Sequence, residues 1–205
     1  MSLVEGGRRE ATKQANRAAI LQAARRVFAD LGFGAASVRD IVRRTDLATG
    51  TFYNYFDDKE AVFRALVEDA AAQVRLLTRA ARREATTTEA FVADGFRAYL
   101  SFLVQDREAS ELLRRNTGTV RAMFDDPAIG QGAVELEADL RWGIAEGLLP
   151  DHDAGAMATA MTGAGLELGM RLLEADDRDL EADVAFLRDL FLGGLEQMGR
   201  TRDPG

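Results

Sequence analysis

Residues 49–56 have the composition of a surface that makes polar contacts. The segment reads Thr-Gly-Thr-Phe-Tyr-Asn-Tyr-Phe, so hydroxyl and amide groups lie beside two phenylalanines. Hydroxyls bind phosphate oxygens well, and an Asn side chain can pair with an adenine edge. The chemistry that this composition favours is recognition by hydrogen bonding. Phe52 and Phe56, four positions apart, would pack beneath the segment onto Val38, Ile41 and Val42.

Two short helices must position these side chains. Residues 37–45 read Ser-Val-Arg-Asp-Ile-Val-Arg-Arg-Thr and place apolar side chains at 38, 41 and 42, the spacing of one helical face. Ser37 is placed to cap this helix, and Asp40 stands at the third position of a capping box. The tight connection at 46–48 leads into the second helix. The arrangement predicts a helix-turn-helix, whose second helix enters the major groove of DNA.

Length and composition narrow the class of protein. The 205 residues suffice for one large or two modest domains with a buried core. The chain contains no Cys, which excludes disulfides and thiolate metal sites. No apolar run approaches the roughly 20 residues of a membrane span, and residues 1–10 lack the apolar stretch of a signal peptide. We therefore expect a cytoplasmic protein.

Charge is unevenly distributed along the chain. Residues 1–56 contain nine Lys or Arg and five Asp or Glu, a net charge of +4. The remainder contains 17 basic and 29 acidic residues, a net charge of −12. A basic head and an acidic body are typical of a protein whose N-terminal part meets nucleic acid. Chance clustering on solvated faces would give the same distribution, so the charge only supports the motif.

The remaining pattern predicts an all-α protein. Prolines occur only at 127, 150 and 204, and alternation of β-branched residues is nowhere sustained. A long first helix should end at Gly32, because Gly tolerates the left-handed conformation at a helix C-terminus. Helices are expected at about 13–31, 59–83, 108–124 with a break near Gly118, 131–146 and 180–198. Another helix follows 86–88 and carries Phe91, Phe96, Tyr99, Phe102 and Leu103. A further one, which Asp151 or Asp153 can cap, carries Met157, Met161, Leu168 and Leu172.

The first helix and the motif together resemble the N-terminal domain of the TetR/AcrR family of transcriptional regulators. The resemblance covers about residues 16–65. It rests on Ala23-Ala24, Phe28-Ala29, Gly32-Phe33, Ser37-Val38, Ile41-Val42, the segment 49–56 and Lys59-Glu60. One departure lies in the turn, where Asp46, Leu47 and Ala48 replace the family's frequent Gly-Val-Ser. Ala48 cannot cap the second helix as Ser would, which costs up to about 1 kcal/mol unless Thr49 assumes part of that role.

The resemblance implies a ligand-responsive regulator of transcription rather than an enzyme. Family members are homodimers, most often repressors that a small apolar or amphipathic molecule releases from double-stranded operator DNA, although a few relatives activate. The implied organisation is a disordered arm at 1–12, a three-helix helix-turn-helix DNA-binding domain at 13–57, a C-terminal helical ligand-binding and dimerisation domain at 58–199 and a flexible tail at 200–205.

Contacts with DNA are expected from the motif and its edges. The expected residues are Ser37, Arg39, Arg43, Thr49, Gly50, Thr51, Tyr53, Asn54, Tyr55 and Lys59. Asn54 and either Arg39 or Arg43 would reach base edges, whereas the hydroxyls and the Lys59 ammonium would bind phosphates. The basic residues at 8, 9 and 13 form either a minor-groove arm or a plain disordered tail.

The body offers a candidate ligand pocket that an ordinary helical core would equally explain. Its expected lining is Phe96, Tyr99, Phe102, Leu103, Asn116, Met123, Phe124 and Trp142. If two of Arg97, Arg115 and Arg121 face inward, an anionic ligand such as an acyl carboxylate or an acyl-CoA phosphate becomes reasonable. Exposure of these arginines at the surface is the alternative.

Wide apolar arcs on the last two helices predict a dimer interface of two helices from each subunit. The residues expected there are Leu166, Met170, Leu173, Leu190, Phe191 and Gly194.

No cofactor and no metal site is expected, because 151–153 are consecutive and cannot all face one ion. Two other classes remain: a DNA-binding module that recruits a protein partner through its body, and an enzyme that uses His152.

Overall fold

The computed structural model describes residues 2–123, 126–174 and 179–202, and within them the chain is all-α. The helices are α1 Ser2–Leu31, α2 Val38–Val42, α3 Thr49–Phe52, α4 Lys59–Glu84, α5 Thr88–Gln105, α6 Arg107–Arg115, α7 Thr117–Ala122, α8 Pro127–Ala145, α9 Ala154–Glu174 and α10 Leu180–Arg202. No helix among the described residues is both long and apolar enough to cross a membrane. The predicted fold class is confirmed.

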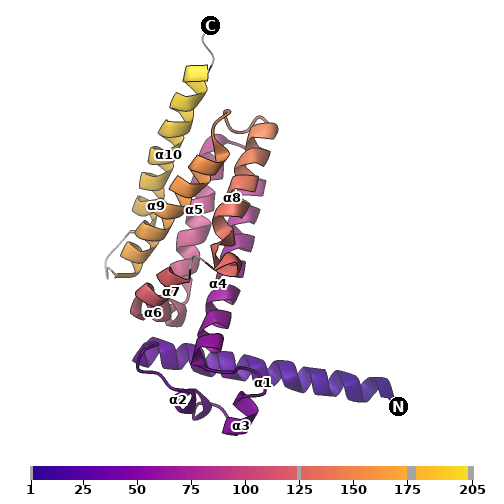
Figure 1. Ribbon diagram of the computed structural model, residues 1–205. Helices are drawn as coiled ribbons and strands as arrows, with labels where there is room; N and C mark the ends of the chain where they lie inside the picture. The colour runs from indigo at the N-terminus through magenta and orange to yellow at the C-terminus, as the bar shows by residue number, and fades with distance from the viewer. Residues whose placement is uncertain (1, 124–125, 175–178, 203–205) are drawn as a thin grey trace.

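The molecule is elongated, with a small head below an upright bundle (Figure 1). Helix α1 lies across the lower end, α2 and α3 lie beneath it, and α4 rises from the head into the bundle that α5 and α8 to α10 complete. Two apolar cores match this division. Phe28, Ile41, Phe52 and Phe63 are fully buried in the head core, and Phe91 is fully buried in the bundle core.

Local sequence explains most of the helix ends. Gly32 has a φ of 77° and its amide donates to Phe28 O at 3.1 Å, which ends α1 as predicted. Asp58 caps α4 by accepting from the Ala61 amide at 2.7 Å. Asp153, one of two candidates, caps α9 by accepting from the Ala156 amide at 3.0 Å.

Four predicted boundaries are wrong. Helix α1 begins at Ser2, so the expected disordered arm is helical, and the break after α6 falls at Asn116 instead of Gly118. The φ of −119° at Asn116 interrupts the helix there, and its side-chain amide donates to Leu112 O, four residues earlier, at 2.7 Å. Helix α8 begins at Pro127, because proline suits the first turn of a helix. Helix α10 continues to Arg202, and 203–205 of the expected tail lie outside the described residues.

Candidate nucleic-acid interface and ligand pocket

Helix α2 is fixed at its start by the predicted capping box. The Asp40 amide donates to Ser37 Oγ at 3.3 Å, and the Ser37 amide donates to Asp40 Oδ2 at 3.0 Å. The Ser37 hydroxyl also donates to that carboxylate, which holds the pKa of Asp40 below its ordinary value. Because these bonds use the Ser37 side chain, Ser37 orients α2 before any contact with DNA.

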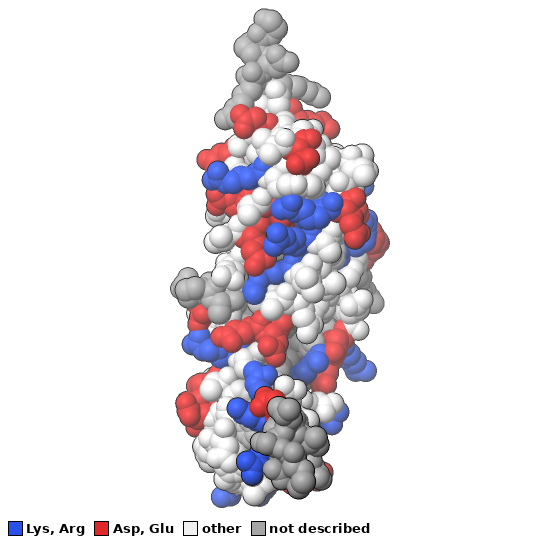
Figure 2. Space-filling view, turned by 90° about the vertical axis from the view of Figure 1, so that its right-hand side faces the viewer, with Lys and Arg blue, Asp and Glu red and all other residues white. Residues whose placement is uncertain are grey.

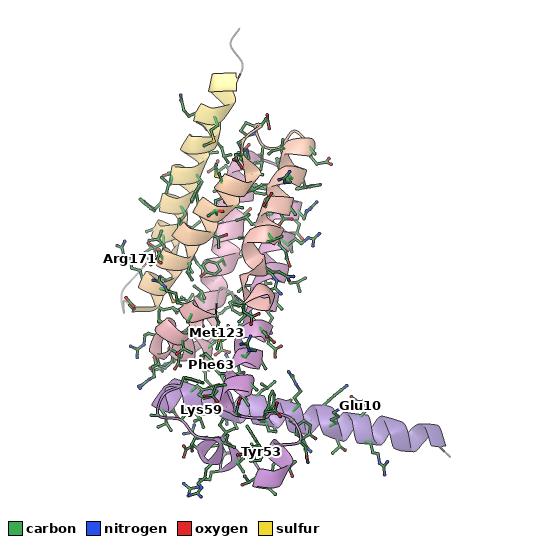
Figure 3. All side chains as sticks on the ribbon, viewed as in Figure 1. Glu10, Tyr53, Lys59, Phe63, Met123 and Arg171 are labelled. Carbon is green, nitrogen blue, oxygen red and sulfur yellow. The ribbon has the colours of Figure 1, made fainter. Side chains whose placement is uncertain are left out.

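Helix α3 turns its polar residues outward. Phe52 and Phe56 are buried in the head core, as expected, while Thr49, Gly50, Tyr53 and Asn54 are exposed. Tyr53 lies at the lower pole of the head, away from the bundle (Figure 3). The cap residue Ala48 makes no side-chain hydrogen bond, as its methyl group requires. The outward face of α3 therefore presents hydroxyl and amide groups, with the Tyr53 ring among them, to a polar partner.

The other expected DNA contacts divide into accessible and partly occupied groups. Arg39 on α2 and Arg43 directly after it are exposed, whereas Thr51 and Tyr55 are half-buried. The Tyr55 hydroxyl accepts from Asn16 Nδ2 at 3.2 Å, so part of its hydrogen-bonding capacity serves the joint between α1 and α3.

Lys59 is positioned differently from its prediction. Its ammonium donates to Phe33 O at 2.8 Å, to Ala36 O at 3.0 Å and to Gly34 O at 3.4 Å. The same nitrogen lies 4.6 Å from the centre of the Phe33 ring. Lys59 therefore joins the start of α4 to the loop after α1, and a phosphate would have to compete with three carbonyl oxygens.

Asn116 connects the head to the bundle and does not line a pocket. Its Oδ1 accepts from the Phe33 amide at 2.6 Å, and its Nδ2 donates to Phe28 O at 3.2 Å and to Leu112 O at 2.7 Å. An amide side chain can donate and accept at once, so one residue satisfies backbone groups of both parts. Salt bridges of Arg25 with Asp106 and of Arg26 with Glu108 bind α1 to α6 nearby.

A cavity of about 180 Å³ lies in the bundle among α4, α5, α8 and α9. Phe96, Tyr99, Phe102 and Leu103, all predicted, line one side of it. The prediction missed the α4 side, which Val67, Ala71, Val74, Thr78 and Arg82 supply. A signal was present, because these five positions follow one another at the spacing of a single helical face.

The remaining pocket predictions need correction. Met123 packs on the head core, between head and bundle (Figure 3), and Trp142 packs on the bundle core under Arg83, whose guanidinium carbon is 4.1 Å from the ring centre. Neither residue lines the cavity. Phe124 lies outside the described residues.

The three arginines considered for an anionic ligand lie at the surface. Arg97 pairs with Glu181 and Asp94, Arg115 pairs with Glu111, and Arg121 pairs with Glu167. Hydrogen bonds from Arg114 and Arg115 lower the pKa of the half-buried Glu111 to about 2. The alternative of surface exposure is therefore the correct one.

The residues expected at a dimer interface fall into two groups. Leu166 and Met170 line the cavity, Phe191 is buried and stacks on Phe96 at 5.6 Å, and Leu173 packs on the bundle core. These four point inward because α9 and α10 both pack against α5. Leu190 is 53% exposed, as is its neighbour on the same stripe, Phe186, at 58%. Gly194 is half-buried beside that stripe.

His152, the residue that the enzyme alternative would use, is buried. Its Nδ1 lies 2.7 Å from Pro150 O, and only 7% of the residue is exposed. In the described part of the chain, no group of three His, Asp or Glu side chains could hold a metal ion.

Similar proteins were found by sequence and by structure. The family model described as bacterial regulatory proteins, tetR family, matches residues 20–66. The HTH-type transcriptional regulator YvdT of Bacillus subtilis (strain 168) is 46% identical over 50 residues, which cover 24% of this chain and 26% of that protein. YdgC of the same strain is 40% identical over 63 residues, 31% of this chain and 32% of YdgC. These matches span about a quarter to a third of the relatives.

Solved structures share the fold over nearly the whole chain. The fatty acid degradation regulator FadR from Bacillus halodurans superposes with a TM-score of 0.75 at 24% identity, over 87% of this chain and 95% of FadR. FadR from Bacillus subtilis, solved in complex with stearoyl-CoA, gives a TM-score of 0.73 at 21% identity, over 86% of this chain and 97% of that one.

Proposed function

Because this chain belongs to the TetR family of bacterial regulatory proteins, we propose that it binds operator DNA as a homodimer and is released by a small apolar or amphipathic molecule. Repression is the proposed sign of regulation. The observation that carries the proposal is the cavity in the bundle, since its lower wall is part of the head core. Val67, Val120 and Ile129 belong to both.

The exposed face of α3 supports the DNA-binding half of the proposal. Thr49, Tyr53 and the half-buried Thr51 would bind phosphates, and Gly50 would allow close approach of the backbone. Asn54 from α3, with Arg39 or Arg43 from α2, would reach base edges. Two such heads would occupy successive major grooves about one helical turn, or a multiple of it, apart.

The shared wall supports the response to a ligand. A molecule that fills the cavity presses on Val67 of α4 and Val120 of α7, and both side chains also pack in the head core. A packed wall of this kind shifts as a unit because protein interiors are dense. The shift would change the angle between head and bundle, and with it the spacing of the two heads. FadR of Bacillus subtilis, with stearoyl-CoA bound, shows that this fold accommodates an effector with a long apolar part.

Operator binding tests the DNA-binding half. An operator is first selected from genomic DNA fragments, and affinities are then measured by fluorescence anisotropy at several salt concentrations. Asn54→Ala and Arg43→Ala should each cost about 1–3 kcal/mol if the side chain reads a base. Arg171→Ala is the matched control, because this exposed arginine lies on the body, far from Tyr53 (Figure 3). Wild-type affinity in both head variants would contradict the proposed interface.

Release by a ligand tests the other half. A library of metabolites is screened for a rise in melting temperature, and hits are added to the protein–operator complex. A coupling of 1–3 kcal/mol would lower operator affinity by roughly 5- to 150-fold. A library without any stabilising compound would favour the alternative, a regulator whose body recruits a protein partner.

A further inference from the structure

The cavity is long and narrow, with its polar groups at one end. Its α4 wall runs from Val67 to Arg82, a separation of 15 residues, or about 22 Å at the rise of an α-helix. The lower part of the wall is apolar, through Val67, Ala71 and Val74. Polar groups enter the lining at the upper part, as Arg75, Thr78 and Arg82 of α4, together with Glu135 of α8, which pairs with Arg75. A cavity of this form matches a chain-like molecule better than a compact one.

The upper end of the cavity holds a buried guanidinium group, that of Arg82. Arg82 Nε donates to Asp139 Oδ2 at 2.9 Å, and Arg82 Nη2 donates to Thr78 Oγ1 at 3.3 Å. The Arg82 side chain is 9% exposed and that of Asp139 is 2% exposed. Gly95 leaves room for this arrangement, because a Cβ there would lie 3.3 Å from Arg82 Cγ. The guanidinium thus lies between α4, α5 and α8, against the cavity.

The Asp139 carboxylate pairs with several guanidinium groups at the seam between α4 and α8. Asp139 also pairs with Arg83 at 3.2 Å and approaches Arg79 at 4.0 Å. Among the described residues, Asp139 is the acid paired with Arg79, Arg82 and Arg83, while Arg75 pairs with Glu135 at 3.1 Å. Basic and acidic side chains lie together in the upper half of this side of the body (Figure 2). The seam therefore carries more positive than negative charge.

The surplus charge has a physical consequence. Burial lowers the pKa of Arg82, and Asp139 only partly opposes that effect. A buried cation that has lost water is stabilised by a further anion within hydrogen-bonding reach. An anionic group entering the upper end of the cavity would provide one, without disturbing the apolar lower wall.

We propose that the effector is a single-chain amphiphile with an anionic head group, which accepts hydrogen bonds from Arg82 while its chain lies along Val74, Ala71 and Val67. The inference rests on the proposed function and adds the chemical class of its ligand. The head group is a carboxylate, as in a free fatty acid, or a phosphate, as in an acyl thioester of coenzyme A. Binding of the head loosens the contact of Arg82 with Asp139, which joins α4 to α8.

Ligands that share one chain but differ in head group test the proposal. Palmitate, palmitoyl-CoA, methyl palmitate and hexadecanol compete with a fluorescent fatty acid for the full-length protein. At least one anionic compound should bind about 10-fold or more tightly than the two neutral ones, the effect of charge-assisted hydrogen bonds. The first two compounds distinguish the carboxylate from the phosphate. Equal affinities of all four would overturn the head-group assignment.

Replacing Arg82 and Asp139 together by neutral residues tests the role of Arg82. The double variant R82Q/D139N keeps two hydrogen-bonding side chains of similar size and leaves no unpaired buried charge. It should retain its affinity for hexadecanol and lose the preference for the anionic compounds. R97Q/E181Q, an exposed pair on α5 and α10, is the control and should bind as the wild type does. Retained anion preference in R82Q/D139N would overturn the role of Arg82.

The outcomes also separate the inference from the proposed function. If anionic and neutral chains bind equally and both release the operator, the proposed function stands and the anionic class is wrong. If no compound binds and none alters operator affinity, both the anionic class and the long-chain cavity ligand are wrong.

Discussion

A single lysine, expected to bind phosphate, also holds the start of α4 to the loop after α1. Lys59 follows the helix-turn-helix directly, where a cation could meet phosphate, yet its ammonium is hydrogen-bonded to the carbonyls of Phe33, Gly34 and Ala36. Those carbonyls follow α1, whose C-terminal end has a partial negative charge. Lys59 thereby fixes the direction in which α4 leaves the head.

Replacing Lys59 by Met removes the ammonium charge and keeps an unbranched side chain of similar length. The substitution therefore tests the hydrogen bonds that fix the direction of α4. Lys59→Met should lower the free energy of unfolding by about 1.5–3 kcal/mol, because hydrogen bonds to a charged group are lost. Urea denaturation measures the change, and Lys13→Met, at an exposed position on α1, should leave stability nearly unaltered. If Lys59→Met were as stable as the control and only lowered the salt dependence of DNA binding, the phosphate role would be the correct one.

At the level of helices, the close contact of α9 with α5 shapes the cavity. A Cβ at Gly169 would lie 2.6 Å from Leu103 Cδ1 and 3.0 Å from the Tyr99 hydroxyl, and both of these side chains line the cavity. Glycine at this position lets α9 approach α5 closely, so that Leu103 and Tyr99 of α5 are directed toward α4 and the cavity. Burial raises the pKa of Tyr99, so its hydroxyl stays neutral in this contact.

Two alanine substitutions on α9 test the packing. Gly169→Ala should destabilise the protein by about 1–3 kcal/mol through overpacking. Gly163→Ala, on the same helix with no atom within 4 Å of its added Cβ, should stabilise it by about 0.5–1 kcal/mol. Thermal unfolding of both variants gives the comparison. A neutral effect of Gly169→Ala would mean that Leu103 and Tyr99 move aside without cost.

For the whole molecule, the outer face of α10 is the proposed contact between two copies. Phe186 and Leu190, four residues apart and more than half exposed, form an apolar stripe on it. Large apolar side chains next to one another at a surface mark protein contacts more often than single ones do. Dimerisation through α10 would leave the heads at the opposite, lower end free to meet DNA, as the arrangement in Figure 1 allows.

A charge placed on that stripe should separate the copies. Leu190→Asp is expected to convert the dimer to a monomer in sedimentation velocity, because a carboxylate would be buried without a partner. Operator affinity should fall with it, since each head alone binds one half-site. Leu76→Asp, at a 71% exposed leucine on α4, is the matched control and should remain dimeric. A dimeric Leu190→Asp would place the contact on another face.

The sequence by itself determined the head, because its structure depends on neighbours along the chain. The Ser37–Asp40 capping box, the end of α1 at Gly32 and the burial of Phe52 and Phe56 all follow from residue types and short spacings. Only the tertiary structure decided the site in the body. Asn116 bonds partners 83 and 88 positions away, and Arg82 meets Asp139 across 57 positions. Helical periodicity indicates that one face of each helix is buried. The packing of α4 against α5, α8 and α9 then determines which of the buried residues face a cavity and which fill the core.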